Sequence, residues 1–215
     1  KMRELIPAVQ KLWQGDYAHE GEHWQFPKTT SSPKPVQQPG PPIWVAARDP
    51  NSHDFAVANG CNVQCTPLHN PFSEIESLMQ RFNDACAKSP EVPRPKIMVL
   101  RHTYVADSEE DAQLGAEELH RFYVYFGAWF KNERPISQGL IEVPEEDFAN
   151  HPFYSPEGMR KNQIVGQADE VIARIKGYEA LGYDEFSLWI DSGMSFERKR
   201  NSLRRFIEDV MPAFA

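Results

Sequence analysis

The chain has 215 residues, a formal net charge of −8 and 40% hydrophobic residues, which suits one well-packed globular domain. The acidic balance and the lack of a basic cluster argue against nucleic acid or an anionic membrane as the main partner. No apolar run reaches the roughly 20 residues that a membrane span needs, and no signal peptide opens the chain, so we expect a cytoplasmic protein. The three cysteines are too few for a disulfide framework and are expected to be buried thiols: Cys61, Cys65 and Cys86.

Residues 1–40 are expected to form an amphipathic helix, a small hairpin and a proline-rich connection. Leu5, Val9 and Leu12 repeat at helical spacing, which places one apolar stripe on the first helix. Residues 15–26 alternate aromatic and polar side chains, a pattern typical of a hairpin. The following segment is rich in proline and has no period, so it predicts an extended surface connection.

The hairpin segment also contains a zinc-metalloprotease signature, H-E-x-x-H, at His19 to His23. Zinc binding by this motif requires the two histidines to lie one turn apart on a helix. Gly21 between the histidines and Pro27 just after them favour the hairpin instead. We therefore expect no metal site, and a zinc hydrolase stays a weak alternative.

Residues 41–65 predict a strand, a tight turn, a helix and a second strand. Ile43 to Ala47 is a short apolar run of the kind found in strands that are buried on both faces. Asp49 can cap a helix that begins at Pro50, where the missing N–H of proline costs nothing. Asn59-Gly60 ends that helix.

The turn between this strand and its helix is the candidate binding site. Arg48 follows the strand, and Asn51 and Ser52 add backbone N–H groups and a hydroxyl at the helix start. Helix N-termini favour anions such as phosphate. Asp49 repels phosphate unless it caps the helix or pairs with Arg48, and a structural ion pair of Arg48 is the alternative interpretation.

The rest of the chain predicts further strand–helix units. Strands are expected at 96–106 and 185–190, and helices at 73–86, 108–130, 167–181 and 195–212. Residues 131–165 have weak periodicity and predict an irregular insert.

The repeated pattern predicts the fold class. Four strand–helix units within residues 41–215 favour an α/β fold, a parallel sheet covered by helices. A full (β/α)8 barrel needs about 250 residues, so this chain fits half of a barrel or a doubly wound sheet. Arg101 and His102 lie inside a predicted strand, where an unpaired charge is costly; an ion pair at the sheet end and an active-site role both stay open.

Seven short motifs keep a characteristic order along nearly the whole chain. They are LWQGDYAHEGEHWQF at 12–26, PKP with Gln37 at 33–37, PIWVAA at 42–47, Ala58-Asn59-Gly60, Gly166 with Glu170-Val171, Gly182-Tyr183-Asp184-Glu185 and Asp209-Val210-Met211-Pro212. Together they resemble the luciferase-like flavin-dependent monooxygenases, the family of bacterial luciferase. The resemblance is to the carboxyl-terminal half of that fold, so we expect an amino-terminal half to be missing here.

The resemblance implies a TIM-type (β/α)8 barrel that binds reduced FMN, or in some members the deazaflavin F420, at the carboxyl ends of its strands. It implies an enzyme that oxidises a small organic substrate with O2, with a flavin reductase as partner. Half a barrel leaves two open sheet edges, so we also expect a homo-oligomer. By position, the flavin phosphate would be held by Arg48, Asp49, Asn51 and Ser52. Family members often carry serine or another small residue where this chain has Asp49. The catalytic residues stay unknown, and a non-catalytic flavin-binding or oligomerisation protein is the alternative.

Overall fold

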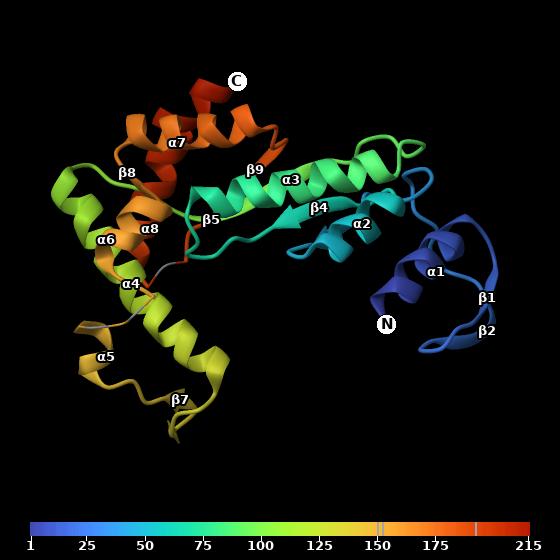
Figure 1. The fold of residues 1–215 in the computed structure, drawn as a ribbon, viewed down its shortest axis with the longest axis horizontal. Coiled ribbons are helices and arrows are strands. Elements are labelled where there is room, and N and C mark those ends of the chain that lie inside the picture. Colours follow the sequence, from blue (N-terminus) through green and yellow to red (C-terminus); the bar gives the residue numbers. More distant parts are fainter. Residues whose placement is uncertain (150, 152, 192) are drawn as a thin grey trace. The chain divides into compact units, whose positions relative to one another are not determined.

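The computed structural model describes residues 1–149, 151, 153–191 and 193–215. Figure 1 shows the ribbon of the chain, whose described residues form two compact units. The first unit comprises 1–64 and 81–97, and the second comprises 65–80 and 98–215. The second unit contains a buried hydrophobic cluster around Tyr104, Leu119 and Val165, and the first unit buries apolar side chains such as Val45, Val57 and Val63.

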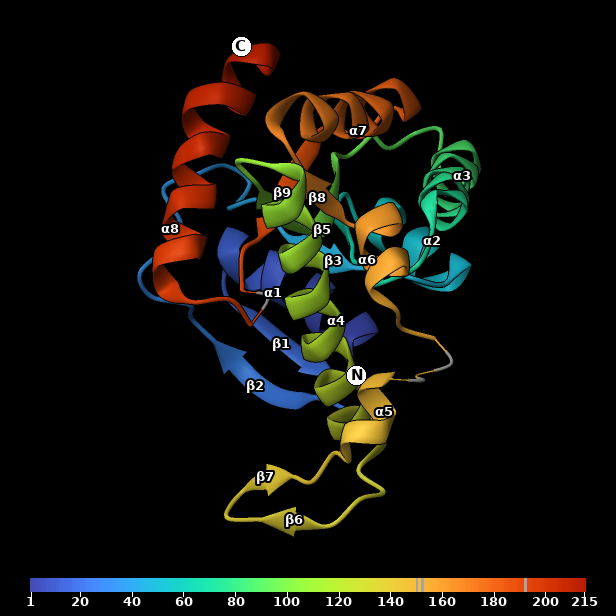
Figure 2. The ribbon, with the colours of Figure 1, turned by 90° about the vertical axis from the view of Figure 1, so that its left-hand side faces the viewer.

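The first unit opens with a helix and a hairpin that lie side by side (Figures 1 and 2). Helix α1 spans Met2–Gln14, and strands β1 (Tyr17–Glu20) and β2 (Gln25–Thr29) pair antiparallel. The predicted helix and hairpin are therefore confirmed. A Cβ at Gly40 would lie 2.3 Å from Cε3 of Trp13, so the proline-rich connection needs glycine where it crosses this indole ring.

The strand–helix–strand prediction is also confirmed, with bounds that differ by one residue or less at most ends. Strand β3 (Trp44–Ala46) pairs parallel with β4 (Asn62–Cys65), and α2 (Pro50–Ala58) connects them. Gly60 has a φ of +64°, the left-handed conformation that glycine adopts at little cost after a helix end. Cys61 and Cys65 are buried free thiols as expected, and Cys86 is a partly buried one.

Helix α3 (Phe72–Lys88) begins one residue before the predicted start, so Ser73 lies inside its first turn. The part of α3 in the first unit packs against α2. Lys88 Nζ lies 2.8 Å from a carboxylate oxygen of Asp54 on α2. Phe82 on the same stretch is fully buried.

The long strand β5 (Ile97–Val105) organises the second unit. Strand β9 (Glu185–Trp189) pairs parallel with Met98–His102, and β8 (Ile164–Gly166) pairs parallel with Thr103–Val105. Strand β8 lies at the end of the segment predicted to be irregular. Its three residues are too few to show a period, although all of them are buried.

Helices follow the strands of the second unit, as predicted. They are α4 (Glu109–Lys131), α7 (Ala168–Leu181) and α8 (Phe196–Arg205), and α8 continues into a π-helical turn (Phe206–Val210) and a 3-10 turn (Met211–Phe214). The hydroxyls of Ser108 and Ser195 accept hydrogen bonds from the first turns of α4 and α8. Gly182 ends α7 in the left-handed conformation.

The insert at 131–165 is more regular than predicted. It carries a short antiparallel pair, β6 (Ile136–Ser137) and β7 (Leu140–Ile141), and two short helices, α5 (Glu145–Ala149) and α6 (Pro156–Asn162). The β6–β7 pair follows the carboxyl end of α4 (Figure 2). Residues 150 and 152 of the insert lie outside the described residues.

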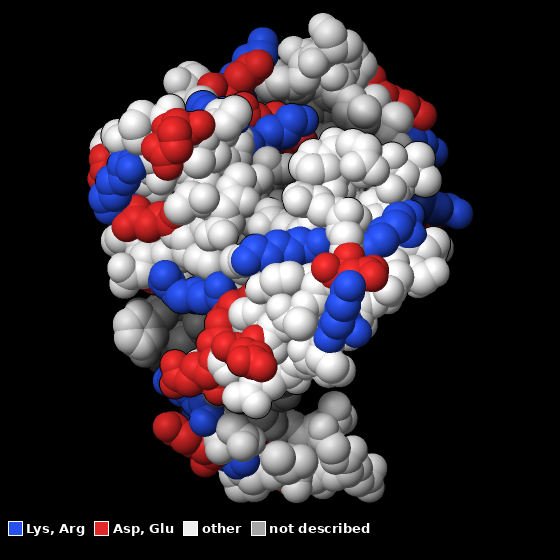
Figure 3. Space-filling view, turned by 90° about the vertical axis from the view of Figure 1, so that its right-hand side faces the viewer, with Lys and Arg blue, Asp and Glu red and all other residues white. Residues whose placement is uncertain are grey.

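None of the helices in the described part of the chain is both long enough and apolar enough to cross a membrane. On the face drawn in Figure 3, acidic and basic side chains lie next to one another among uncharged residues. That face therefore presents both signs of charge.

Candidate functional site

The turn after β3 brings the four predicted site residues to the start of α2. The side chain of Arg48 is exposed, and its guanidinium forms no hydrogen bond or ion pair with the residues that the structure describes. The carbonyl oxygen of Arg48 accepts a 2.6 Å hydrogen bond from Nη1 of Arg81. The main chain of the turn is thus tied down while the Arg48 guanidinium stays available to an anion.

Asp49 uses its carboxylate to cap α2. It accepts the backbone N–H of Ser52 at 3.1 Å and the Ser52 hydroxyl at 2.5 Å. Both hydrogen bonds lower the pKa of Asp49, and the bond from the Ser52 hydroxyl has the larger effect. An ionised carboxylate therefore occupies the helix N-terminus, and an incoming phosphate must share or displace its hydrogen bonds.

Two further arginines, which no sequence pattern indicates, gather at this turn. Arg3 on α1 donates to the carbonyl oxygen of Asn51 at 3.1 Å, and its guanidinium lies 5.3 Å from the ring centre of Phe55. Arg81 on α3 donates to the carbonyl of Arg48, as described above. Together with Arg48 they give the start of α2 three positive charges against the one negative charge of Asp49. No local signal in the sequence marks Arg3 or Arg81, because both come from distant helices.

His53 supports the same turn from inside the unit. It is fully buried, and its Nδ1–H donates to the Asp49 carbonyl at 3.0 Å. Burial lowers the pKa of His53, and the nearby charge of Arg81 lowers it further. The ring is therefore neutral at neutral pH, and its Nδ1 fixes the backbone of the capping residue.

A second group of candidate residues lies in the second unit, where β5 and β9 run side by side. Their register pairs His102 with Trp189. The two rings stack with centroids 4.0 Å apart and planes 20° apart. His102 is 1% exposed, and neither of its ring nitrogens has a hydrogen-bond partner among the described residues.

Arg101 is held by main-chain carbonyl groups, and no ion pair of its guanidinium is found among the described residues. Its guanidinium donates to the carbonyl oxygens of Leu68, at 2.7 Å, and Asn70, at 3.1 Å, and also to that of Asn162. Burial lowers the pKa of Arg101. The ion pair considered for the sheet end is therefore not formed among the described residues: main-chain carbonyls accept from both Nη atoms of this buried guanidinium, while its Nε has no hydrogen-bond partner there.

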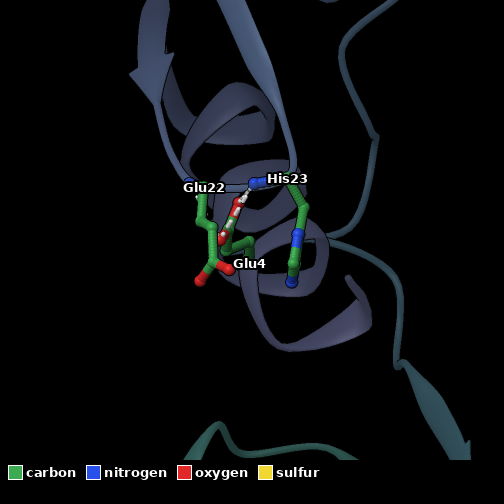
Figure 4. A group of neighbouring side chains, drawn as sticks. All are labelled: Glu4, Glu22 and His23. Carbon is green, nitrogen blue, oxygen red and sulfur yellow. Dashed lines mark hydrogen bonds between the residues drawn. The ribbon is translucent and has the colours of Figure 1, made fainter.

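The H-E-x-x-H motif lies in the β1–β2 hairpin, so its histidines do not share one face of a helix. The carboxylate of Glu4 on α1 instead accepts the backbone N–H groups of Glu22 and His23 (Figure 4), and also that of Trp24. The His23 bond contributes most to lowering the pKa of Glu4. One ligand atom each of Glu4, Glu22 and His23 lie within 4.8 Å of one another. Because the Glu4 oxygens already hold the turn, the arrangement is explained as a clamp between α1 and the hairpin.

Comparison with known proteins identifies the family of this chain. The model of a family described as luciferase-like monooxygenases matches residues 1–185, which is most of the chain. The chain belongs to this family. The resemblance noted in the sequence is thereby confirmed.

Two relatives show how much of such a protein is present. Over its whole length the chain is 67% identical to the oxygenase component of a flavin-dependent trigonelline monooxygenase from Acinetobacter baylyi, and it covers 60% of that protein. The solved structure of the monooxygenase RslO1 from Streptomyces bottropensis is 27% identical with a TM-score of 0.75; the match covers 99% of this chain and 60% of that one. The chain thus spans about 60% of the length of these luciferase-like relatives.

A third likeness concerns the fold alone. A type II Baeyer–Villiger monooxygenase from the CAM plasmid of Pseudomonas putida, solved with FMN, is 16% identical with a TM-score of 0.66. The match covers 98% of this chain and 62% of that one. The parallel pairing of β3 with β4, and of β5 with β8 and β9, agrees with the barrel architecture of the luciferase-like relatives. The predicted fold, part of a TIM-type α/β barrel, is confirmed.

Proposed function

We propose that this protein is the oxygenase of a two-component flavin-dependent monooxygenase. The observation that carries the proposal is the arginine-flanked start of α2 in a chain of the luciferase-like family, where Arg48 keeps an exposed guanidinium without a partner in the described part of the chain. When bound, reduced flavin supplies the electrons for oxygen chemistry. The protein's part is to bind and orient the flavin and to exclude water.

The flavin phosphate is proposed to bind at Arg48, Asn51 and Ser52. Arg48 contributes a charge-assisted hydrogen bond, and α2 contributes its positively polarised N-terminus. Asp49 would turn away from Ser52 as the phosphate arrives, which frees the Ser52 N–H and hydroxyl. FMN is the flavin proposed, and the deazaflavin F420 is the alternative to be tested against it.

The proposed substrate is trigonelline or a close analogue, because the 67%-identical relative is named for that compound. Trigonelline is a small planar pyridinium with a methyl group on nitrogen and one carboxylate. It falls within the predicted class of small organic molecules that are oxidised with O2.

The test is oxygen uptake by the full-length protein with a flavin reductase, NADH, FMN and trigonelline. We expect uptake that depends on all components, with formation of an oxidised product of trigonelline detected by mass spectrometry. Reduced F420 in place of FMN serves as the cofactor control. Tight flavin binding without any product would favour the non-catalytic alternative.

The proposed partners are a flavin reductase, which delivers the reduced cofactor, and further copies of the same chain. Light scattering of the full-length protein alone and after mixing with the reductase measures both. A purely monomeric protein would contradict the homo-oligomer, and reduced flavin generated chemically should replace the reductase if delivery is its only role.

A further inference from the structure

Trp189 is the last residue of β9, at the carboxyl end of a parallel strand. Its neighbours Phe186 and Leu188 belong to the opposite face of the sheet. There Phe186 contacts Tyr178 of α7 and Phe206 after α8, with ring centroids 6.1 and 6.5 Å apart. Because successive side chains alternate in a strand, Trp189 lies on the face away from these helices. In a barrel that face points inward, and the carboxyl ends of the strands carry the site.

The indole of Trp189 is held in one orientation. His102 stacks on it at 4.0 Å, and Phe122 and Phe126 of α4 meet it nearly edge-on at 78° and 81°. The remaining part of the indole is partly exposed. Trp189 is thus a rigid aromatic surface at the open end of the strand.

The histidine that stacks on this indole is unusual, because it is a buried polar ring. Its two ring nitrogens have no hydrogen-bond partner among the described residues, although the side chain is 1% exposed. Burial, with the charge of Arg101 added, lowers the pKa of His102 to about 3, so the ring carries no charge at neutral pH. A neutral ring supports the indole by stacking and does not repel a cation bound on the accessible side.

We propose that the accessible part of the Trp189 indole binds the ring of a planar aromatic cation, the substrate of the proposed monooxygenase, with His102 as the residue that positions the indole. Tryptophan is the side chain that attracts cations most strongly through its ring face. The inference rests on the proposed function and adds the residue that selects for a positively charged ring.

The test is calorimetric binding of trigonelline to the full-length protein without flavin. Nicotinate is the control ligand, because it has the same ring and carboxylate but lacks the N-methyl group and its fixed positive charge. Relative to wild type, Trp189→Leu should weaken trigonelline binding about 10-fold and nicotinate binding much less, and Trp189→Phe should fall between. All three proteins should bind reduced FMN equally.

His102 is tested by rescue. His102→Ala should raise the KM for trigonelline and leave kcat within about 2-fold, because the variant loses the ring that positions the indole but keeps the residues that contact the reacting groups. His102→Phe should restore the KM, since a phenyl ring can replace the stack. A purely structural role would instead lower kcat and thermal stability together and would give no selective rescue.

Two results would overturn the inference: no binding of trigonelline by the wild type, or a Trp189→Leu variant that loses FMN and keeps trigonelline. The second result would assign the indole to the flavin. Failure of the proposed function is recognised separately. Trp189-dependent binding of trigonelline without any oxygen uptake would refute the monooxygenase and leave the binding surface standing.

Discussion

Asp49 places a carboxylate where the phosphate of a flavin is expected, and at the residue scale this is the most unusual feature of the site. The carboxylate is explained by its hydrogen bonds to the N–H and hydroxyl of Ser52, which cap α2. A helix cap and a phosphate need the same donors. Binding of FMN therefore carries the cost of displacing Asp49.

Asp49→Asn should tighten the binding of reduced FMN about 5-fold or more. Asparagine caps helices as well as aspartate does, so α2 is kept while the repulsion of the phosphate is removed. Anaerobic fluorescence titration measures the affinity, with reduced riboflavin, which has no phosphate, as the control ligand. Equal or weaker binding of FMN by the variant would show that the phosphate does not approach this carboxylate.

His102 predicts a pH dependence of stability. Its pKa is about 3 in the folded protein against the ordinary 6.5. Below pH 6.5 His102 binds a proton in the unfolded chain but stays unprotonated in the folded protein. The free energy of unfolding therefore falls as the pH drops from 6.5 towards 3. The slope from this group is at most about 1.4 kcal/mol per pH unit.

Urea unfolding at several pH values between 7 and 4 measures this slope. The matched variant is His102→Phe, which keeps a ring against Trp189 and cannot titrate. We expect the wild type to lose stability more steeply than the variant on acidification. Parallel curves would mean that His102 is solvated and titrates normally in the folded protein.

At the element scale, the fit of α4 against β5 depends on Gly115. A Cβ at this position would lie 2.7 Å from Cδ1 of Tyr104. The tyrosine ring has little freedom to move, because its hydroxyl donates to Asp111 at 2.8 Å and accepts from Nε of Arg198 at 3.2 Å. The helix and the strand can approach this closely only with glycine between them.

Gly115→Ala should therefore destabilise the protein by about 1–3 kcal/mol, although alanine is the better helix former. Gly177→Ala in α7 is the control, because its new Cβ would meet Phe72 at an ordinary 3.6 Å. That substitution should stabilise by about 0.5–1 kcal/mol. Chemical denaturation measures both, and changes of the same sign would refute the packing argument.

Elements with strong local chemistry could be predicted from the sequence, and the others could not. The helices that begin at Pro50, Glu109 and Phe196 are predictable because good capping residues, Asp49, Ser108 and Ser195, precede them. Strand β8 was missed because three residues carry no period, and its place is set by pairing with β5. The short helices α5 and α6 could not be predicted, because the prolines near them, Pro144, Pro152 and Pro156, favour turns in a sequence-based prediction.

The same distinction applies to the candidate site. Arg48, Asp49, Asn51 and Ser52 are neighbours in sequence, so their meeting at one helix start followed from the predicted turn. Arg3 reaches the turn only because α1 packs against α2, and sequence patterns do not specify which helices meet. The stack of His102 on Trp189 depends on the register of two strands, which is also a tertiary property.

At the scale of the whole molecule, the chain is part of a luciferase-like barrel and spans about 60% of the length of its relatives. Its two units each carry one candidate element: the arginine-flanked turn in the first and the indole surface in the second. The proposed function assigns the first to the cofactor, and the further inference, which rests on that function, assigns the second to the substrate. The contacts behind each assignment lie within a single unit.

The most direct test of the central claim is the affinity of the full-length protein for reduced FMN and reduced riboflavin, measured anaerobically in the wild type and in Arg48→Ala. If the turn after β3 holds the phosphate, the wild type should prefer FMN by about 10-fold or more, since one charge-assisted hydrogen bond contributes about 1.5–3 kcal/mol. Arg48→Ala should reduce that preference and leave riboflavin binding unchanged. A wild type that binds both flavins equally, or a variant that keeps the full preference for FMN, would contradict the account.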